Sequence, residues 1–239
     1  MSDELEVQSR GSTWCFTLNR PQKLNALNAS LVDRLLAAVQ EAHAAQARLL
    51  VFRGAGKSFS AGFDLSDLER QSEGDLVLRF VRIEMLLQTI ARSPARTLAL
   101  AQGKVFGAGV DLVAVCRERI ASADAIFRMP GLKFGLVLGT RRFGELVGIE
   151  AARQILEDVS PFDAARAQAL NFVHEIASAD GWDGLIERAQ ARSQALDDWS
   201  RQALYRALDS RCADSDPAQL VRSAARPGLK DRLQAYVRK

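Results

Sequence analysis

The sequence predicts an α/β protein built around a largely parallel sheet. Strand-like runs alternate with amphipathic helical segments through the first half of the chain, an order typical of parallel neighbouring strands. The run at 49–52 is continuously apolar, as expected for a strand buried on both faces. A second apolar run, 97–102, ends at Gly103 and leads into a glycine-rich turn. These two runs, and the turns that follow them, organise the rest of the prediction.

The remaining elements follow in chain order. Two short strands between residues 5 and 18 precede a helix whose apolar residues repeat on one face over 31–42. Residues 66–69, Ser-Asp-Leu-Glu, have the form of a capping box and predict a helix start, ahead of a long amphipathic helix over 76–91. A buried helix is predicted after the second turn, from Ala108 to Cys116.

The second half of the chain changes character. Short strands are expected near 119–121 and 125–128, and a loop over 129–142. Ser160-Pro161-Phe162-Asp163 supplies a cap, a first-turn proline and an acid for a helix reaching residue 170. From Trp182 onward the pattern is almost entirely helical. We therefore predict a core at 1–178 and a C-terminal helical region at 179–239.

Composition excludes several classes of protein. Hydrophobic residues make up 48% of the 239 positions and charged residues 26%, which is ordinary for a soluble globular chain. The formal net charge of +3 is too small and too evenly mixed to indicate a nucleic-acid surface. No apolar stretch is long enough to cross a bilayer, so no membrane partner is expected. The polar start MSDELEVQSR does not resemble a signal peptide, which favours a cytoplasmic location.

Cysteines and histidines give no sign of a metal or redox site. Cys15, Cys116 and Cys212 lie far apart without CxxC spacing, so we predict neither a disulfide framework nor a zinc site. His43 falls in an alanine-rich helix and His174 in a short strand. Both are better explained as structural or solvated residues than as catalytic ones.

Motifs for nucleotide binding and serine hydrolysis fail on spacing. The stretch GAGKS at 54–58 resembles the end of a P-loop, but the required first glycine falls at Val51, inside the strand. The stretch GAG at 107–109 begins a dinucleotide fingerprint whose third glycine position is Leu112. A GxSxG elbow is also missing, so a serine hydrolase has no support.

Two matching loops carry the strongest signal. SAGFDL at 60–65 follows one buried strand and GAGVDL at 107–112 follows the other. A helix start directs unpaired N–H groups and the positive end of its dipole at one spot, and glycine lets a ligand approach the backbone. N–H groups from two such loops can converge on one carbonyl oxygen and stabilise an enolate or a tetrahedral oxyanion. A packed strand-to-helix turn that serves only the core is the alternative.

At these residues the sequence resembles the enoyl-CoA hydratase/isomerase family, also called the crotonase family. The resemblance covers NRPQKLNALN, KSFSAGFDL, QGKVFGAGVDLVAVCRERIASADAIFRMPGLKFGL and LVRSAARPGLKDRL, in that order. It implies a spiral core of repeated ββα turns in two nearly perpendicular sheets. It further implies a helical trimerisation region, and hence a homotrimer or a dimer of trimers.

The resemblance also implies an acyl-CoA substrate and no separate cofactor, because coenzyme A is part of that substrate. It places the thioester oxygen on the backbone N–H groups of Phe63 and Ala108. The nucleotide end of coenzyme A would lie near residues 20–25. Further substrate contacts are implied for Ala61, Gly62, Gly107 and Gly131.

Two departures from the family pattern bear on the chemistry. The first glutamate of the family's hydratases falls at Asp111, one methylene shorter, and the second falls at Gly131, which has no side chain. Water addition needs one group to activate water and another to deliver a proton. We therefore predict a lyase- or isomerase-type enzyme of fatty acid metabolism, in which Asp111 moves a proton beside an enolate.

Three alternatives stay open at this point. The chain can be a non-catalytic acyl-CoA-binding protein that kept the fold and lost the acid. It can also be a thioester hydrolase or a decarboxylase, because the same oxyanion site serves those reactions. Asp111 itself can be a solvated or capping residue without a chemical role.

Overall fold

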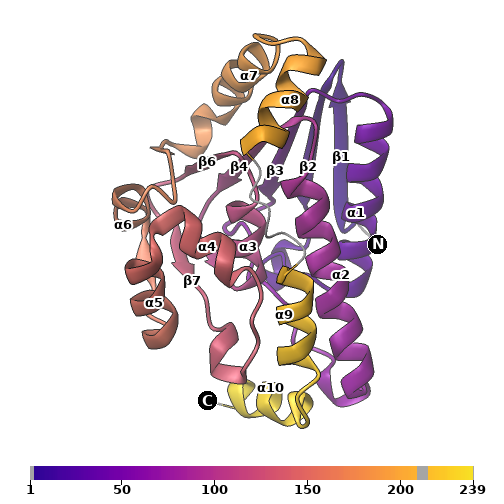
Figure 1. The fold of residues 1–239 in the computed structure, drawn as a ribbon, viewed down its shortest axis with the longest axis vertical. Coiled ribbons are helices and arrows are strands. Elements are labelled where there is room, and N and C mark those ends of the chain that lie inside the picture. The colour runs from indigo at the N-terminus through magenta and orange to yellow at the C-terminus, as the bar shows by residue number, and fades with distance from the viewer. Residues whose placement is uncertain (1–2, 209–214, 239) are drawn as a thin grey trace.

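The computed structural model describes residues 3–208 and 215–238, which form two sheets surrounded by helices (Figure 1). The larger sheet has the strand order β1-β2-β3-β4-β6-β9 and the smaller one the order β5-β7-β8. All pairs in the larger sheet are parallel except β1 with β2, as the alternation of strands and helices predicts. The strands are β1 (Leu5–Arg10), β2 (Thr13–Leu18), β3 (Leu49–Gly54), β4 (Arg96–Ala101), β5 (Lys104–Phe106), β6 (Glu118–Ala121), β7 (Ile126–Arg128), β8 (Phe162–Asp163) and β9 (Glu175–Ile176).

Helices cover the sheets on several sides, and none in the described ranges is long and apolar enough to span a membrane. The α-helices are α1 (Ala29–Ala44), α2 (Glu73–Ala91), α3 (Ala108–Ala114), α4 (Thr140–Val147), α5 (Ile149–Asp158), α6 (Ala164–Ala169), α7 (Trp182–Ser193), α8 (Asp198–Leu208), α9 (Ser215–Ala224) and α10 (Leu229–Val237). Two 3₁₀ turns near the site are η2 (Leu68–Arg70) and η3 (Gly131–Phe134).

The large sheet is buried on both faces, which explains the continuous apolar run of β3. Side chains of β3 alternate between two clusters: Leu50 and Phe52 join the main core with α1, whereas Leu49 and Val51 pack with α7. Fully burying one such side chain contributes about 1.5–3 kcal/mol. Trp182 of α7 belongs to the second cluster, so the C-terminal region begins packed on the sheet.

The helices α9 and α10 pack against α2 (Figure 1). Leu220 of α9 and Leu229 of α10 are almost completely buried, together with Phe80 of α2 and Phe134 of η3. These helices therefore share one apolar cluster with α2 and η3. The division of the chain at residue 178 stays a prediction.

The capping box predicted at residues 66–69 is wrong. Ser66 donates both its N–H and its hydroxyl to the carboxylate of Asp64, and η2 follows instead of an α-helix. The capping box lies six residues later, where the Ser72 hydroxyl accepts from the Asp75 N–H and the Asp75 carboxylate accepts from the Ser72 N–H. Ser66 therefore bonds to Asp64, two residues upstream, and does not cap a helix.

Predictions for 129–142 and for the helix near residue 160 are also partly wrong. The expected loop contains η3 and the first residues of α4. The expected helix starts only at α6, with Asp163 as its cap, because Phe162 first pairs with Phe127 of β7. The pairing of β8 with β7 therefore delays the start of this helix.

Candidate active site

A pocket of about 140 Å³ brings together six of the seven residues that the sequence singled out. Its other walls come from α2, η3, α4 and α10, and they are mostly Phe and Leu side chains. Gly62, the seventh residue, stands just behind the wall. The six are Ala61, Phe63, Gly107, Ala108, Asp111 and Gly131.

The two glycine loops meet at Gly62. This residue has φ +82°, and a β-carbon built on it would lie 2.3 Å from the Phe106 carbonyl oxygen and 3.2 Å from the Ala108 nitrogen. Only glycine fits both that backbone conformation and that contact. A β-carbon on Gly109 would likewise lie 2.8 Å from the Ser60 carbonyl oxygen. The close approach of the loops therefore depends on glycine at two places.

The backbone N–H groups of Phe63 and Ala108 are left for a ligand. Around Phe63, the Leu27 N–H donates to the Gly62 carbonyl at 2.7 Å and the Asp64 N–H donates to the Leu27 carbonyl at 3.2 Å. Ala108 is the first residue of α3, where an N–H has no partner within the helix. Among the residues with described positions, neither N–H has a hydrogen-bond acceptor.

Asp111 is a buried carboxyl that faces this pocket. Its side chain is 3% exposed, and Oδ1 has no hydrogen-bond partner in the part of the chain described. Burial raises the pKa of Asp111 well above its usual value, against the opposing charge of Arg142 and with a further increase from Glu84. Gly139 lies on the carboxyl so closely that a β-carbon there would be 1.8 Å from Oδ1.

A buried ionic network lies behind Asp111. Arg142 of α4 donates to both carboxylate oxygens of Glu84 on α2, at 3.0 and 2.5 Å. Arg142 also lies 3.2 Å from Asp216 of α9, which in turn accepts two hydrogen bonds from Arg141 at 2.8 and 2.7 Å. The network joins three helices and holds the wall of the pocket in place.

Sequence reasoning missed two polar side chains of the pocket, Thr140 and Tyr236. Together with Asp111 they are the lining residues whose side chains carry oxygen. Thr140 begins α4, in a stretch expected to be loop, and Tyr236 comes from the last helix. Neither position gives a local sequence signal, because only the packing of α4 and α10 brings it to the pocket.

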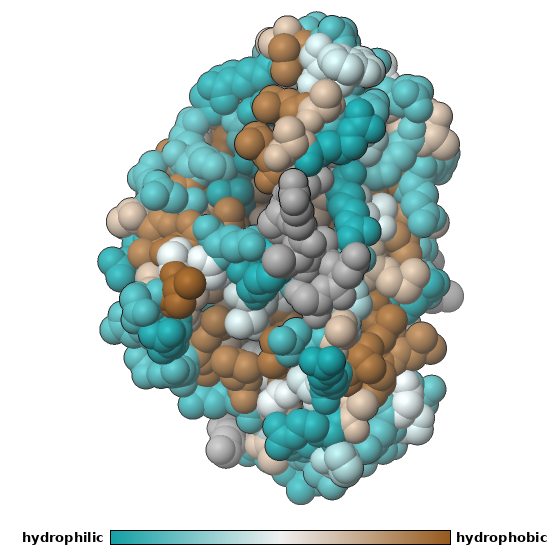
Figure 2. Space-filling view, in the orientation of Figure 1, coloured by the Kyte–Doolittle hydropathy of each residue, from teal (hydrophilic) through white to brown (hydrophobic). Residues whose placement is uncertain are grey.

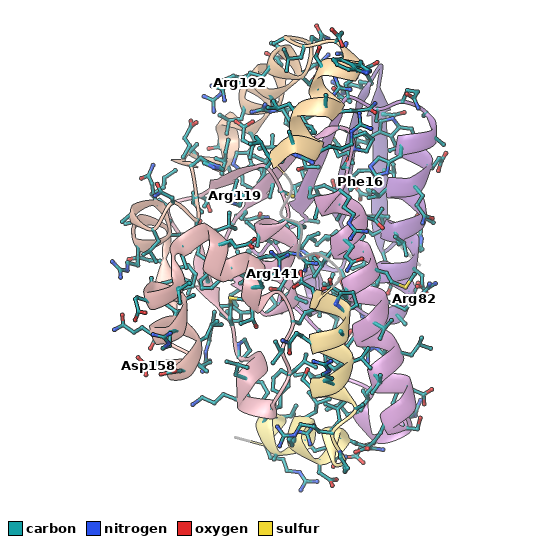
Figure 3. All side chains as sticks on the ribbon, viewed as in Figure 1. Phe16, Arg82, Arg119, Arg141, Asp158 and Arg192 are labelled. Carbon is teal, nitrogen blue, oxygen red and sulfur yellow. The ribbon has the colours of Figure 1, made fainter. Side chains whose placement is uncertain are left out.

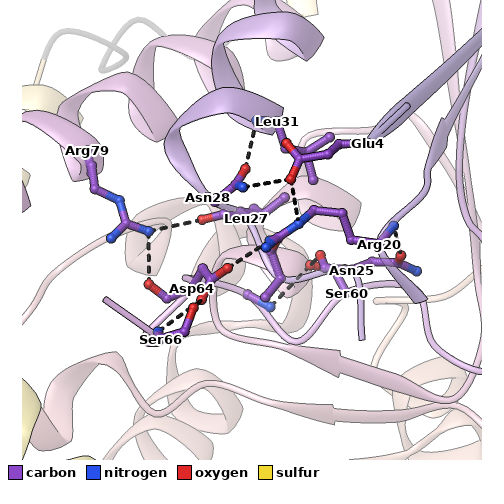
Figure 4. A network of polar contacts seen from close by, with 12 residues as sticks. Glu4, Arg20, Asn25, Leu27, Asn28, Leu31, Ser60, Asp64, Ser66 and Arg79 are labelled. Carbon is purple, nitrogen blue, oxygen red and sulfur yellow. Dashed lines mark hydrogen bonds and ion pairs between the residues drawn. The ribbon is translucent and has the colours of Figure 1, made fainter. Parts of the chain in front are cut away.

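The segment expected near the nucleotide end of coenzyme A uses two of its side chains inside the protein (Figure 4). Arg20 pairs with Asp64 at 2.7 Å and with Glu4 at 3.0 Å. Asn25 is fully buried and donates to the backbone carbonyls of Ala55 and Ser58. These side chains tie the first loop to the sheet.

His43, His174, Cys15 and Cys116 are not among the residues that line the pocket. His43 bonds Ser93 at 2.8 Å, and His174 accepts from the backbone of Arg119. Burial raises the pKa of Cys116 to about 12, so its thiol is unreactive at neutral pH. Cys212 lies outside the described residues, and within the described ranges no cluster of three metal-ligating side chains occurs.

A sequence profile described as enoyl-CoA hydratase/isomerase matches residues 9–231. The chain belongs to the enoyl-CoA hydratase/isomerase family. A crystal structure from Bordetella parapertussis that carries a provisional enoyl-CoA hydratase/isomerase name is 52% identical over the whole of both chains, with a TM-score of 0.98. The predicted family and the crotonase-like α/β fold are thus confirmed.

More distant members show how widely this fold is shared. Enoyl-CoA hydratase from Bacillus halodurans has a TM-score of 0.86 at 22% identity, over 98% of this chain and all of that one, which bears on the fold alone. The bovine mitochondrial protein named enoyl-CoA hydratase domain-containing protein 2 is 32% identical over 185 residues. That match covers 75% of this chain and 62% of the bovine one.

Proposed function

We propose that this family member binds an acyl-CoA thioester and moves a proton along its acyl group through an enolate. One observation carries the proposal: Phe63, Ala108 and Asp111 line the same apolar pocket, and within the described chain the N–H groups of the first two and Oδ1 of Asp111 have no hydrogen-bond partner. A thioester oxygen held by both N–H groups gains stabilisation as it becomes negative. One such donor is typically worth about 10²–10³ in rate.

The environment of Asp111 suits a proton shuttle. Because burial raises its pKa, its carboxylate is a stronger base than an exposed aspartate, and its protonated form is stable beside apolar walls. The carboxylate takes a proton from the α-carbon of a 3-enoyl thioester, and the electron pair of that C–H bond passes to the thioester oxygen. The enolate then collapses as the same proton returns to the γ-carbon, which moves the double bond.

Hydration is the weaker candidate because Asp111 is the only carboxyl among the described residues that line the pocket. At Gly131 a β-carbon would lie 3.2 Å from the Leu136 carbonyl oxygen, so even a small side chain needs some adjustment there. A positioned acid or base contributes about 10²–10⁴ in rate. We therefore expect slow water addition, and no cofactor beyond the coenzyme A of the substrate.

Assembly into a homotrimer or a dimer of trimers is part of the proposal. Apolar residues gather on the face of the molecule over α8 (Figure 2). Trp199 is 75% exposed and Leu208 is 76% exposed, with Leu204 and Leu196 also exposed. Contiguous apolar surface of this kind is typical of an interface between chains. Light scattering tests it, since a monomer at micromolar concentration contradicts the assembly.

The test of the reaction is a comparison of 3-hexenoyl-CoA isomerisation with crotonyl-CoA hydration, followed by absorbance of the conjugated thioester. We expect isomerisation to exceed hydration, and Gly131→Glu to increase hydration. Calorimetric binding without turnover of any acyl-CoA would favour the non-catalytic protein. Release of free coenzyme A would favour the thioester hydrolase, and rapid crotonyl-CoA hydration by the parent would show that another residue supplies the second acid.

A further inference from the structure

Arg79 of α2 lies against the loop that carries Phe63, and Figure 4 shows its hydrogen bonds to the carbonyls of Asp64 and Leu27. Its guanidinium carbon stands 4.0 Å from the centroid of the Phe63 ring. Its Nη2 donates to the carbonyl oxygen of Asp64 at 2.9 Å. The same nitrogen makes a longer hydrogen bond, 3.4 Å, to the carbonyl oxygen of Leu27, the residue bridged to Phe63.

Phe63 is held by α2 on its ring as well as through its backbone neighbours. The Phe80 ring stacks on it at 4.2 Å between centroids and 18° between planes. Phe80 follows Arg79 in the chain and is 1% exposed, so this stack is anchored in the core. Arg79 is itself fixed, because its Nη1 donates to Gln71 at 2.9 Å. Arg79 and Phe80, which are consecutive in α2, thus contact the Phe63 ring, and Arg79 also holds the carbonyl of Asp64.

The fold does not depend on Arg79 for the pairing of this loop. The Leu27 carbonyl also accepts from the Asp64 N–H, and the Gly62 carbonyl accepts from the Leu27 N–H. What Arg79 adds is a restraint on the Phe63 ring and on the carbonyl of Asp64, the next residue. A tilt of the Phe63 ring turns the Gly62–Phe63 peptide, which sets the direction of the Phe63 N–H. A misplacement of about 1 Å in a reactive site can lower a rate about 100-fold.

We propose that Arg79 is a positioning residue that aims the Phe63 N–H at the thioester oxygen. This inference rests on the function proposed above, since it gives that N–H its task. Arg79 is not among the described residues that line the pocket around Asp111. It acts through the Phe63 ring and the Asp64 carbonyl.

Arg79→Met tests the inference, with Arg82→Met as the matched control. Arg82 lies one turn along α2, and its ion pair with Asp33, 2.8 Å long, faces outward (Figure 3). The probe is hexanoyl-CoA labelled with ¹³C at the thioester carbonyl, whose infrared stretch falls when hydrogen bonds polarise it. A second readout is the steady-state isomerisation of 3-hexenoyl-CoA, resolved into kcat and KM.

We expect the parent and Arg82→Met to lower the carbonyl frequency equally. Arg79→Met should show a smaller decrease and a kcat about 10- to 100-fold lower, while KM changes less than about threefold. Arg79→Lys keeps a cation but lacks the planar guanidinium that covers the Phe63 ring and donates from a second nitrogen to Gln71, so its values should lie between those of the parent and Arg79→Met. A change in KM alone would indicate a merely structural role.

Each possible result tests either the role of Arg79 or the function proposed above. A folded Arg79→Met with the carbonyl frequency and kcat of the parent overturns the inference. Where Arg79→Met fails to fold, the same readouts on Arg79→Lys decide, and parent-like values there overturn it as well. A parent protein that binds hexanoyl-CoA without any shift of the carbonyl contradicts the proposed function itself.

Discussion

Two stretches of nearly identical sequence, AGFDL at 61–65 and AGVDL at 108–112, flank the same pocket but fold differently. The first is extended, with Gly62 at φ +82°, and is tied to the sheet by backbone bridges and by Arg20. The second forms the opening turns of α3. The proposed oxyanion donor is consequently the third residue of the first stretch and the first residue of the second.

Their aspartates show the same contrast. Asp64 pairs with Arg20, and it accepts from both the N–H and the hydroxyl of Ser66. Asp111 has one carboxyl oxygen without a partner among the residues described. The five residues that the two stretches nearly share therefore determine neither the backbone conformation nor the surroundings of the aspartate. Arg20, 44 positions upstream of Asp64, and Gly139 beside Asp111 made the difference.

Alanine at Gly62 should have the largest effect of the changes that probe this contrast. Its β-carbon would meet the Phe106 carbonyl at 2.3 Å, in a backbone conformation that alanine already disfavours. We expect the free energy of unfolding, measured by urea titration, to fall by more than about 3 kcal/mol.

Gly107→Ala is the matched control for that variant. Gly107 also has positive φ, but the nearest atom to its β-carbon would be Pro130 Cδ at 3.9 Å. The cost of alanine at positive φ is then the only one, and it should lower the free energy of unfolding by about 1–3 kcal/mol. Equal losses in the two variants would mean that the loops are not in the close contact described.

The sequence predicts elements correctly where an apolar pattern extends over many residues. It fails where a side chain bonds to a partner outside the expected motif. The buried strand β3 and the helix α1 follow from apolar patterns that no other element alters. The capping box moved because Asp64 takes the hydrogen bonds of Ser66. At the site, the glycine loops were visible in the chain, whereas Tyr236 was not, because only the fold joins it to the pocket.

Asp64→Asn should have an intermediate effect that depends on pH. Burial alone would raise the pKa of Asp64, but hydrogen bonds from Ser66 and the Arg20 guanidinium together lower it. A carboxylate with a lowered folded-state pKa contributes stability above its unfolded pKa, about 3.9, and loses that contribution as the pH falls below it. At pH 7 we expect a loss of about 2 kcal/mol in urea titrations. A loss that persists unchanged at pH 3 would contradict an ionic role.

Asp111→Asn should have a smaller effect of opposite sign. Because burial raises the pKa of Asp111, the folded chain binds a proton that the unfolded chain releases above about pH 3.9, so this residue costs stability as the pH rises. Because asparagine does not ionise, this cost disappears, and the protein should gain about 1 kcal/mol of stability at pH 7, or about 2–4 °C in Tm. Proton transfer should be lost at the same time, with hexanoyl-CoA affinity nearly unchanged. A lower Tm at pH 7 would contradict the raised pKa of Asp111.

The central claim, that backbone groups from the two loops hold one oxygen, is tested most directly by the turnover of Ala108→Pro. Ala108 is the first residue of α3, a position where proline is tolerated and where its missing N–H is the only donor removed. With Ala108→Gly as the control that keeps the N–H, we predict a kcat for 3-hexenoyl-CoA isomerisation about 10²–10³ lower in Ala108→Pro, and near the parent value in Ala108→Gly. A folded Ala108→Pro that turns over at the parent rate would contradict the account.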